Sequence, residues 1–194
     1  MAWCAALRKT AAMPDPAAPA PAAPESAAVP DSLLFTRIVA HAAAETGQPL
    51  SRALGLSRSA LARLVDRHAP AFAATVAALP ADAGPGEDEL EETDLRALVL
   101  EHRAGAGEEE EWLAAIVARR SMGGQHLWQD MGFANRGELN AMFRRHFPAL
   151  VAANAADMKW KKFFYRQLCA REGFLLCKSP NCEQCDDRAE CFAT

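Results

Sequence analysis

The feature that most constrains the fold is a succession of short segments with helical spacing, each bounded by residues that start or stop a helix. Ser57 can cap a segment of helically spaced apolar residues that Pro70 ends. Asn135, with Glu138 three residues later, forms an N-terminal capping pair for a segment that stops at Pro148. No segment convincingly alternates apolar and polar residues as a half-buried strand does. The pattern predicts an all-α domain of six to eight helices with short loops.

Other segments fit the same pattern. Asp31 can cap the first helix of the domain, and Thr93 can start a helix after an acidic stretch, residues 82–92, that we expect to be a solvated loop. The segment EEEEWLAAIVARR places four carboxylates at the positive end of a helix dipole and two arginines at its negative end. This arrangement stabilises a helix, so it supports a further helical segment.

The chain divides into a tail and one domain. Its 194 residues, 51% of them hydrophobic, can bury one fair-sized core. The N-terminal residues cannot join that core, because six of the twelve prolines lie between Pro14 and Pro30 and alanine fills most of the remainder. We therefore expect a disordered Pro/Ala-rich tail over residues 1–30 and a single multi-helix domain over residues 31–194, with a cysteine-rich cluster-binding loop at residues 177–191.

Charge and hydropathy limit the partners. A net charge of -4 argues against general nucleic-acid binding, which needs an excess of Lys and Arg. No run of about 18 apolar residues exists to span a bilayer, and the N-terminus lacks the unbroken apolar segment of a secretory signal. These observations predict a cytoplasmic protein with neither a membrane nor a nucleic-acid partner.

The last helical segment, MKWKKFFYRQLCAREG, has two chemically different faces. One face has the i, i+3, i+4, i+8 spacing of a buried apolar stripe: Trp160, Phe163, Phe164 and Leu168. The other has an i, i+3, i+7, i+10 spacing and is largely basic: Lys159, Lys162, Arg166 and Cys169. We expect the basic face to lead directly into the cysteine-rich end of the chain.

Four of the six cysteines crowd into the last eighteen residues, CKSPNCEQCDDRAECFAT: Cys177, Cys182, Cys185 and Cys191. In a reducing cytoplasm this crowding favours metal binding or redox chemistry over disulfides. Four thiolates suit either tetrahedral zinc or an iron-sulfur cluster. Zinc sites usually join two separated C-x2-4-C pairs, whereas only Cys182 and Cys185 form such a pair here. The spacing favours iron-sulfur, with structural zinc as the main alternative and unligated cysteines as a third.

Neighbouring residues could assist such a site. A four-thiolate cluster carries negative charge that is costly to desolvate, and Lys159, Lys162 and Arg166 could offset it. Cys169 could be an additional ligand, although a cysteine in such a place is more often a small buried filler. His126 could ligate a metal in transit, or belong to a packing cluster at a helix start.

A family resemblance follows from these residues. The runs HLWQDMGF, ELNAMFRRHFPAL and NAADMKWKKFFYRQLCAREGF, followed by C-x4-C-x2-C-x5-C, resemble the NifQ family of nitrogen-fixation proteins. The resemblance is good from about Arg119 to the end and weaker from Asp31 to Leu100. It implies an iron-sulfur protein, with a 4Fe-4S or Mo-Fe-S cluster, that carries molybdenum and supplies it for biosynthesis of the nitrogenase iron-molybdenum cofactor.

The resemblance also implies a ligand set and partners. The family's cluster ligands correspond to Cys177, Cys182, Cys185 and Cys191. The implied partners are the cofactor-assembly scaffold NifEN, the nitrogenase iron protein NifH and a molybdenum source such as molybdate. Molybdate is a dianion, so the basic face of the last helix could attract it before it is incorporated.

Two other classes of function compete with this one. The run LSRALGLSRSALARLVDRH resembles a helix-turn-helix, so a DNA-binding regulator with an iron-sulfur or zinc loop as its sensor is the alternative. Its second helix offers Arg58, Arg63 and Arg67 but also Asp66, in a chain that is acidic overall. An enzyme is disfavoured because the sequence has no H-E-x-x-H, P-loop or dinucleotide fingerprint. We predict a carrier, and redox activity of its cluster remains open.

Overall fold

The computed structural model describes residues 29–87 and 91–172. Within these ranges the chain forms helices and no strand, which confirms the all-α prediction. The elements are α1 (Asp31–Ala44), α2 (Leu50–Leu54), α3 (Arg58–His68), a short 3-10 helix (Pro70–Phe72), α4 (Ala73–Ala77), α5 (Glu92–Glu101), α6 (Glu108–Ser121), α7 (Leu127–Asp130), α8 (Arg136–His146), α9 (Pro148–Ala153) and α10 (Trp160–Glu172). The expected tail, apart from residues 29 and 30, and the cysteine loop lie outside the described residues.

The described part has more helices than the six to eight expected, because several are very short. The helices α2, α4, α7 and α9 have five, five, four and six residues, too few to show a helical period in the sequence. Pro148 does end α8 as predicted, but it also starts α9. Proline suits this first helical position because its fixed φ is already helical and no intrahelical bond needs its missing N–H.

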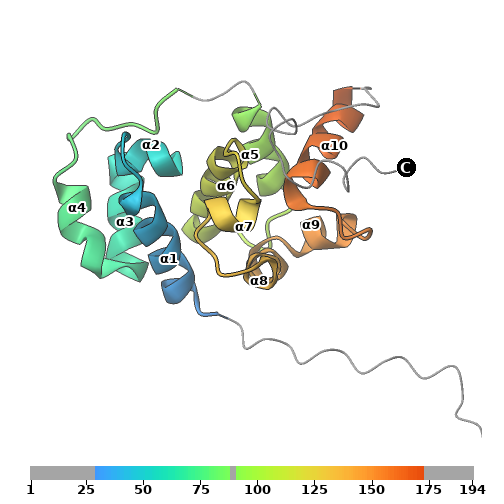
Figure 1. Ribbon diagram of the computed structural model, residues 1–194, viewed down its shortest axis with the longest axis horizontal. Helices are drawn as coiled ribbons and strands as arrows, with labels where there is room; N and C mark the ends of the chain where they lie inside the picture. Colours follow the sequence, from blue (N-terminus) through green and yellow to red (C-terminus); the bar gives the residue numbers. More distant parts are fainter. Residues whose placement is uncertain (1–28, 88–90, 173–194) are drawn as a thin grey trace, which may run out of the picture.

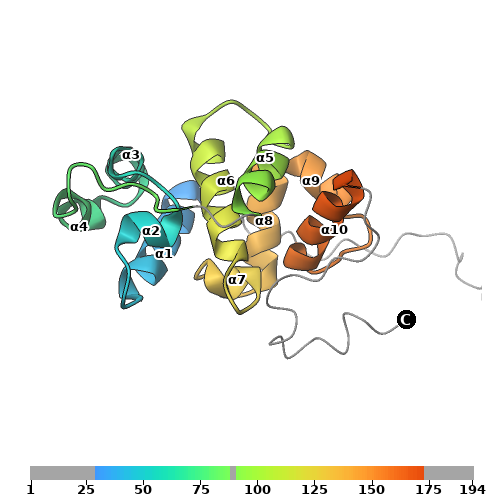
Figure 2. The same ribbon diagram turned by 90° about the horizontal axis from the view of Figure 1, so that it is seen from above.

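The helices are arranged around α6. Figure 1 shows α1 to α4 on one side of α6 and α8 to α10 on the other, and Figure 2 shows the same order from above. Every residue of α6 from Trp112 to Ala118 is buried, as expected for a helix surrounded by others. One continuous apolar core results, and its largest fully buried side chains include five phenylalanines: Phe35, Phe143, Phe147, Phe163 and Phe164.

Two of the predicted helix caps, Ser57 and Asn135, are present. The side-chain oxygen of Ser57 accepts a hydrogen bond from the backbone N–H of Ala60 (3.2 Å), and that of Asn135 accepts one from Glu138 (3.1 Å). The carboxylate of Glu138 in turn accepts from the backbone N–H of Ala134 (2.9 Å). These bonds satisfy backbone donors that have no partner inside the helix, so local sequence is sufficient to place the starts of α3 and α8.

Asp31 does not cap α1. Pro30 occupies the cap position, and Asp31 is the first helical residue. The Asp31 carboxylate instead accepts hydrogen bonds from Arg145 and from Nε2 of His146, both at the end of α8. Burial alone would raise the pKa of Asp31, but these two partners outweigh burial and lower it. The residue therefore joins α1 to α8.

Glu92 was expected in the solvated acidic loop, and this prediction was wrong. Glu92 is the first residue of α5, one position before the predicted start at Thr93, and it is 0% exposed. Nε of Arg119, on α6, lies 2.9 Å from both of its carboxylate oxygens. The buried charge is tolerated because a paired and hydrogen-bonded carboxylate avoids most of the cost of desolvation.

The first turn of α6 is connected to α3 and α8 by its glutamates. Glu109 accepts hydrogen bonds from Arg67 (2.7 Å) and from Nε2 of His68 (3.1 Å). Glu110 lies 3.0 Å from Nδ1 of the buried His146. Burial alone would raise the pKa of Glu109, but the hydrogen bonds from Arg67, from a backbone N–H and from His68 lower it from its ordinary 4.5 to about 2. Folding therefore favours the ionised form of Glu109.

The lowered pKa of Glu109 predicts acid sensitivity. The ionised Glu109 carboxylate stabilises the folded state fully above pH 4.5, and this stabilisation is lost as the pH falls through about 2. The reason is that the Glu109 carboxylate binds a proton at a higher pH in the unfolded chain than in the folded one. We expect Glu109→Gln to lower Tm at pH 7 by about 2–4 °C and to flatten the fall in Tm between pH 4.5 and 2. The control is Glu111→Gln, since Glu111 is 60% exposed and 3.9 Å from Arg103. Thermal unfolding at low ionic strength measures both, and parallel curves for the two variants would contradict the assignment.

Candidate metal site

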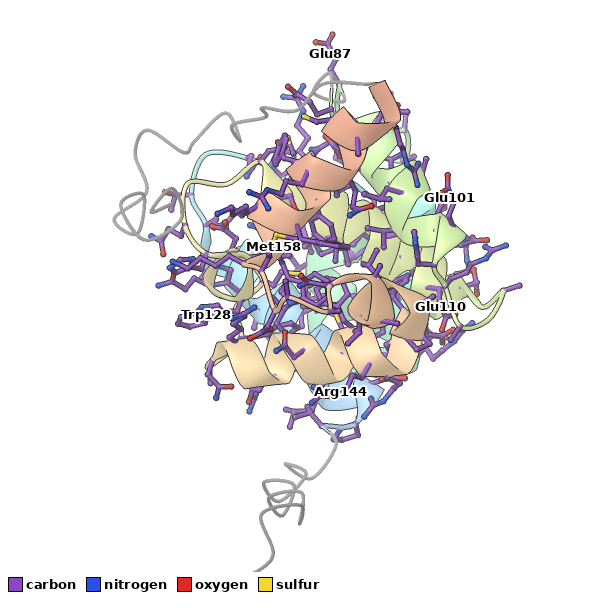
Figure 3. All side chains as sticks on the ribbon, turned by 90° about the vertical axis from the view of Figure 1, so that its right-hand side faces the viewer. Glu87, Glu101, Glu110, Trp128, Arg144 and Met158 are labelled. Carbon is purple, nitrogen blue, oxygen red and sulfur yellow. The ribbon has the colours of Figure 1, made fainter. Side chains whose placement is uncertain are left out.

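The helix α10 determines where the cysteine-rich segment leaves the described core. In its predicted apolar stripe, Trp160, Phe163 and Phe164 are at most 5% exposed, whereas Leu168 is only partly buried. The Trp160 ring lies 4.1 Å from that of Phe143 between centroids. Near its end, Arg171 donates to both carboxylate oxygens of Glu101, the last residue of α5, at 3.1 and 2.5 Å. Figure 3 shows Glu101 on α5 beside α10. The last turn of α10 is thus held against the end of α5.

The four predicted ligands, Cys177, Cys182, Cys185 and Cys191, lie outside the described residues, and their role stays a prediction. In the sequence, Cys177 follows Glu172, the last residue of α10, by five residues. Four thiolates are the donor set that iron-sulfur clusters use, so the chemistry of these residues fits such a cluster.

The predicted basic residues lie at the surface, with Lys159 directly before α10 and Lys162 and Arg166 on it. Arg166 is exposed and its guanidinium lies 3.5 Å from the Met158 sulfur, while Lys159 and Lys162 are partly exposed. Cys169, expected on the same side, is only 5% exposed. The basic surface therefore consists of Lys159, Lys162 and Arg166 without Cys169, and an accessory metal role for Cys169 stays a prediction.

One lysine in this region was not singled out from the sequence. Lys161 donates to Asp130 (2.5 Å) and to the backbone carbonyl of Gly123 (2.7 Å), which ties the segment before α7 to α10. The run KWKK shows several lysines, but only the fold shows that Lys161 pairs with Asp130. His126 precedes α7, and its backbone N–H donates to Gln129 (3.1 Å). This geometry agrees with the helix-start interpretation of His126 and leaves its proposed metal role untested.

In residues 29–87 and 91–172, no group of three or more His, Cys, Asp or Glu side chains is arranged to hold a metal ion. The C-terminal cysteines therefore remain the residues on which a metal hypothesis depends.

Comparison with known proteins identifies the family. A family model described as NifQ matches residues 34–193, which include α10 and all four cysteines of the C-terminal motif. The chain belongs to the NifQ family. Membership supports a role in nitrogen fixation, in the biosynthesis of the iron-molybdenum cofactor.

Individual NifQ proteins are similar over most of the chain. Protein NifQ of Rhodobacter capsulatus is 48% identical over 146 residues, 75% of this chain and 78% of that protein. Protein NifQ of Azotobacter vinelandii is 39% identical over 149 residues, 72% and 76% of the two chains. A Protein NifQ homolog of Sinorhizobium fredii is 39% identical over 146 residues, 74% and 62% of the two chains. No solved structure matches this NifQ chain.

The geometry of the helix-turn-helix alternative does not favour DNA binding. The helices α2 and α3 are joined at Gly55, which has a φ of 63°, as a tight turn requires. Arg63 and Arg67 of the supposed recognition helix pair with Glu108 at 2.6 and 2.8 Å. These arginines are thus engaged with a carboxylate of the same NifQ chain, and neither the fold nor the family match supports a regulator.

Among the described residues, no helix combines the length and the apolar character needed to cross a bilayer.

Proposed function

We propose that this NifQ protein is an iron-sulfur protein that carries molybdenum and donates it for biosynthesis of the iron-molybdenum cofactor. The observation that carries the proposal is the family match, which extends through the C-x4-C-x2-C-x5-C motif that follows α10. Sulfide-bridged iron held by four thiolates offers molybdenum the soft ligands that a Mo-Fe-S cluster requires. The protein acts as a carrier and not as a catalyst, and its cluster is 4Fe-4S or Mo-Fe-S.

The position of the motif suits a donor. A donor must release its cargo, and a binding segment that follows a packed core can open at a lower cost than a site inside that core. The described core ends with α10, and the motif begins five residues later. Release from the cysteine segment would then leave the helical core intact.

The proposal includes partners and a molybdenum source. Cargo for the cofactor would pass to the assembly scaffold NifEN and the iron protein NifH, in the cytoplasm. Molybdate, a dianion, is the proposed source, and the basic surface of Lys159, Lys162 and Arg166 would raise its local concentration.

Metal analysis tests this function directly. We expect protein purified without oxygen to contain iron, acid-labile sulfide and molybdenum together, with an electron paramagnetic resonance (EPR) signal of an iron-sulfur cluster. Zinc as the sole metal would instead identify the C-terminal cysteines as a structural zinc site and would overturn the proposal.

A second arm of the same experiment addresses the basic surface. The test variant has its charge reversed, with Glu in place of Lys159, Lys162 and Arg166. We expect molybdenum loading from molybdate to slow by about tenfold at low salt, and iron loading to be affected less. The matched control is Arg144→Glu, because Arg144 is exposed on α8, on a different part of the surface from α10 (Figure 3). Equal losses of molybdenum and iron would count against an electrostatic role in molybdate capture.

A further inference from the structure

His146, at the end of α8, lies between two carboxylates that come from other helices. Its Nδ1 is 3.0 Å from a carboxylate oxygen of Glu110, in the first turn of α6, and its Nε2 is 3.1 Å from a carboxylate oxygen of Asp31, the first residue of α1. Figure 3 labels Glu110 near the end of α8. The His146 side chain is only 4% exposed, so these carboxylates, and not water, are the partners of its ring nitrogens. One buried ring thus connects three helices.

The two contacts require two protons on the ring. An ionised carboxylate has no proton to donate and can only accept a hydrogen bond. A neutral imidazole carries a single N–H, so its other nitrogen would direct an electron pair at the second carboxylate. Only the imidazolium ion donates from Nδ1 and Nε2 together. The contact of His68 with Glu109 differs, because it involves Nε2 alone (3.1 Å) and one proton satisfies it.

The charges around the ring favour the same form. Asp31 also accepts a hydrogen bond from Arg145, so the charged groups in contact with the ring or its partners are Asp31 of α1, Glu110 of α6 and Arg145 of α8. With a neutral ring this cluster would carry one excess negative charge, whereas with an imidazolium it is neutral. Burial alone would raise the pKa of the Asp31 carboxyl, but the hydrogen bonds and charges of Arg145 and His146 lower it. A shielded cluster of charges is stable when its members are paired in this way.

We propose that His146 is a pH-dependent clamp: its ring is doubly protonated in the folded protein at neutral pH, holds α1 and α6 to the end of α8, and releases them when it loses a proton at alkaline pH. The inference concerns the helical core and goes beyond the proposed function, on which it does not depend.

The direction of the pH dependence follows from the proton count. Below about pH 6.5 the histidine of the unfolded chain is protonated as well, so the stabilisation by the clamp is fully present. Above that pH the folded chain retains a proton that the unfolded chain has lost, and stability falls as the pH rises. The stabilisation is gone once the folded ring has also released its proton.

A single isosteric change removes the need for the second proton. In Glu110→Gln, the side-chain amide can donate to a bare Nδ1 of His146 while Nε2–H still donates to Asp31. A neutral ring then satisfies both contacts. Glu111→Gln is the matched control, because Glu111 is the next residue of the same turn but is 60% exposed and lies 3.9 Å from Arg103.

The experiment is a pH titration of the full chain, labelled with 15N-histidine and followed by NMR of the ring nitrogens. The His146 signals are assigned through the backbone, so the wild-type result depends on no variant. At about pH 7.5, where an exposed histidine is mostly neutral, we expect both ring nitrogens of His146 to be protonated in wild type and in Glu111→Gln. In Glu110→Gln one of them should be bare.

Urea unfolding and hydrogen exchange measure what the clamp does. The unfolding equilibrium constant of wild type and Glu111→Gln should rise by up to about tenfold per pH unit above about pH 6.5, and that of Glu110→Gln less steeply. Exchange of the α1 amides, corrected for its intrinsic acceleration with pH, should become at least about threefold faster once the wild-type ring has lost its second proton.

Three results would overturn the proposal. The first is a bare ring nitrogen on His146 in the wild-type protein at about pH 7.5. The second is a pH dependence of stability that Glu110→Gln leaves unchanged. The third is exchange in α1 that does not become faster when the ring is deprotonated, because the ring would then hold two protons without acting as a clamp.

Discussion

In the double variant Cys182→Ala, Cys185→Ala, iron and sulfide bound per chain are expected to fall by more than about tenfold, with loss of the visible absorption of the cluster. These residues form the C-x2-C pair of the motif, so the variant removes two of four thiolates and their negative charge. The remaining two cannot complete four-thiolate coordination. Metal analysis and visible spectroscopy of protein purified without oxygen measure the loss.

The same variant should keep its helical fold. The described core, with its buried aromatic side chains, ends with α10 at Glu172, ten residues before Cys182. Far-ultraviolet circular dichroism and Tm should therefore change little. Cys4→Ala is the matched control, because Cys4 lies before the residues that the NifQ family model matches and should retain full iron. Loss of helical content together with the metal would indicate that the cysteine segment stabilises the fold, as a structural zinc site does.

The parts of the fold that the sequence predicts correctly depend on short-range interactions. The caps at Ser57 and Asn135 are bonds to residues three positions away. The buried stripe of α10 repeats within three turns of helix, so its periodicity is visible in the sequence. Such features depend mainly on neighbours along the chain, and tertiary packing leaves them unchanged.

The predictions that failed concern polar residues with distant partners. Asp31 was expected to cap its own helix, but its partners Arg145 and His146 are 114 and 115 residues away. Glu92 was assigned to a solvated loop, but it is buried and pairs with Arg119, 27 residues away. A single sequence does not show which cation a given carboxylate will meet, so acidic residues near a predicted loop are assigned to solvent by default.

In the candidate site, too, the local features could be predicted from the sequence and the long-range contacts could not. The C-x4-C-x2-C-x5-C motif and the basic residues of α10 are visible in the sequence because their spacing is local. The burial of Cys169 and the pairing of Lys161 with Asp130 depend on side-chain geometry.

The Glu92–Arg119 pair is a buried ion pair that contacts several other elements of the fold. Besides the two 2.9 Å approaches of Nε to Glu92, the Arg119 guanidinium donates to the backbone carbonyls of Arg52, in α2, and of Pro85 (3.0 Å). Arg96, one turn further along α5, also approaches Glu92 at 3.4 Å. The pair thus connects α2, the segment before α5, α5 itself and α6. Removal of Glu92 would leave guanidinium charge in a buried place.

Glu92→Ala is therefore expected to lower the free energy of unfolding by about 3–5 kcal/mol, the usual cost of breaking a buried pair from one side. Asp94→Ala is the control, because Asp94 lies in the same helical turn but is exposed, and it should cost about 0.5 kcal/mol or less. The double variant Glu92→Leu, Arg119→Met should cost less than Glu92→Ala, since it removes both charges and leaves neither buried alone. Urea titrations of the three variants provide the comparison. If the double variant were as unstable as Glu92→Ala, charge pairing with Glu92 would not explain the stability. The hydrogen bonds from Arg119 to the carbonyls of Arg52 and Pro85 would then hold these helices together.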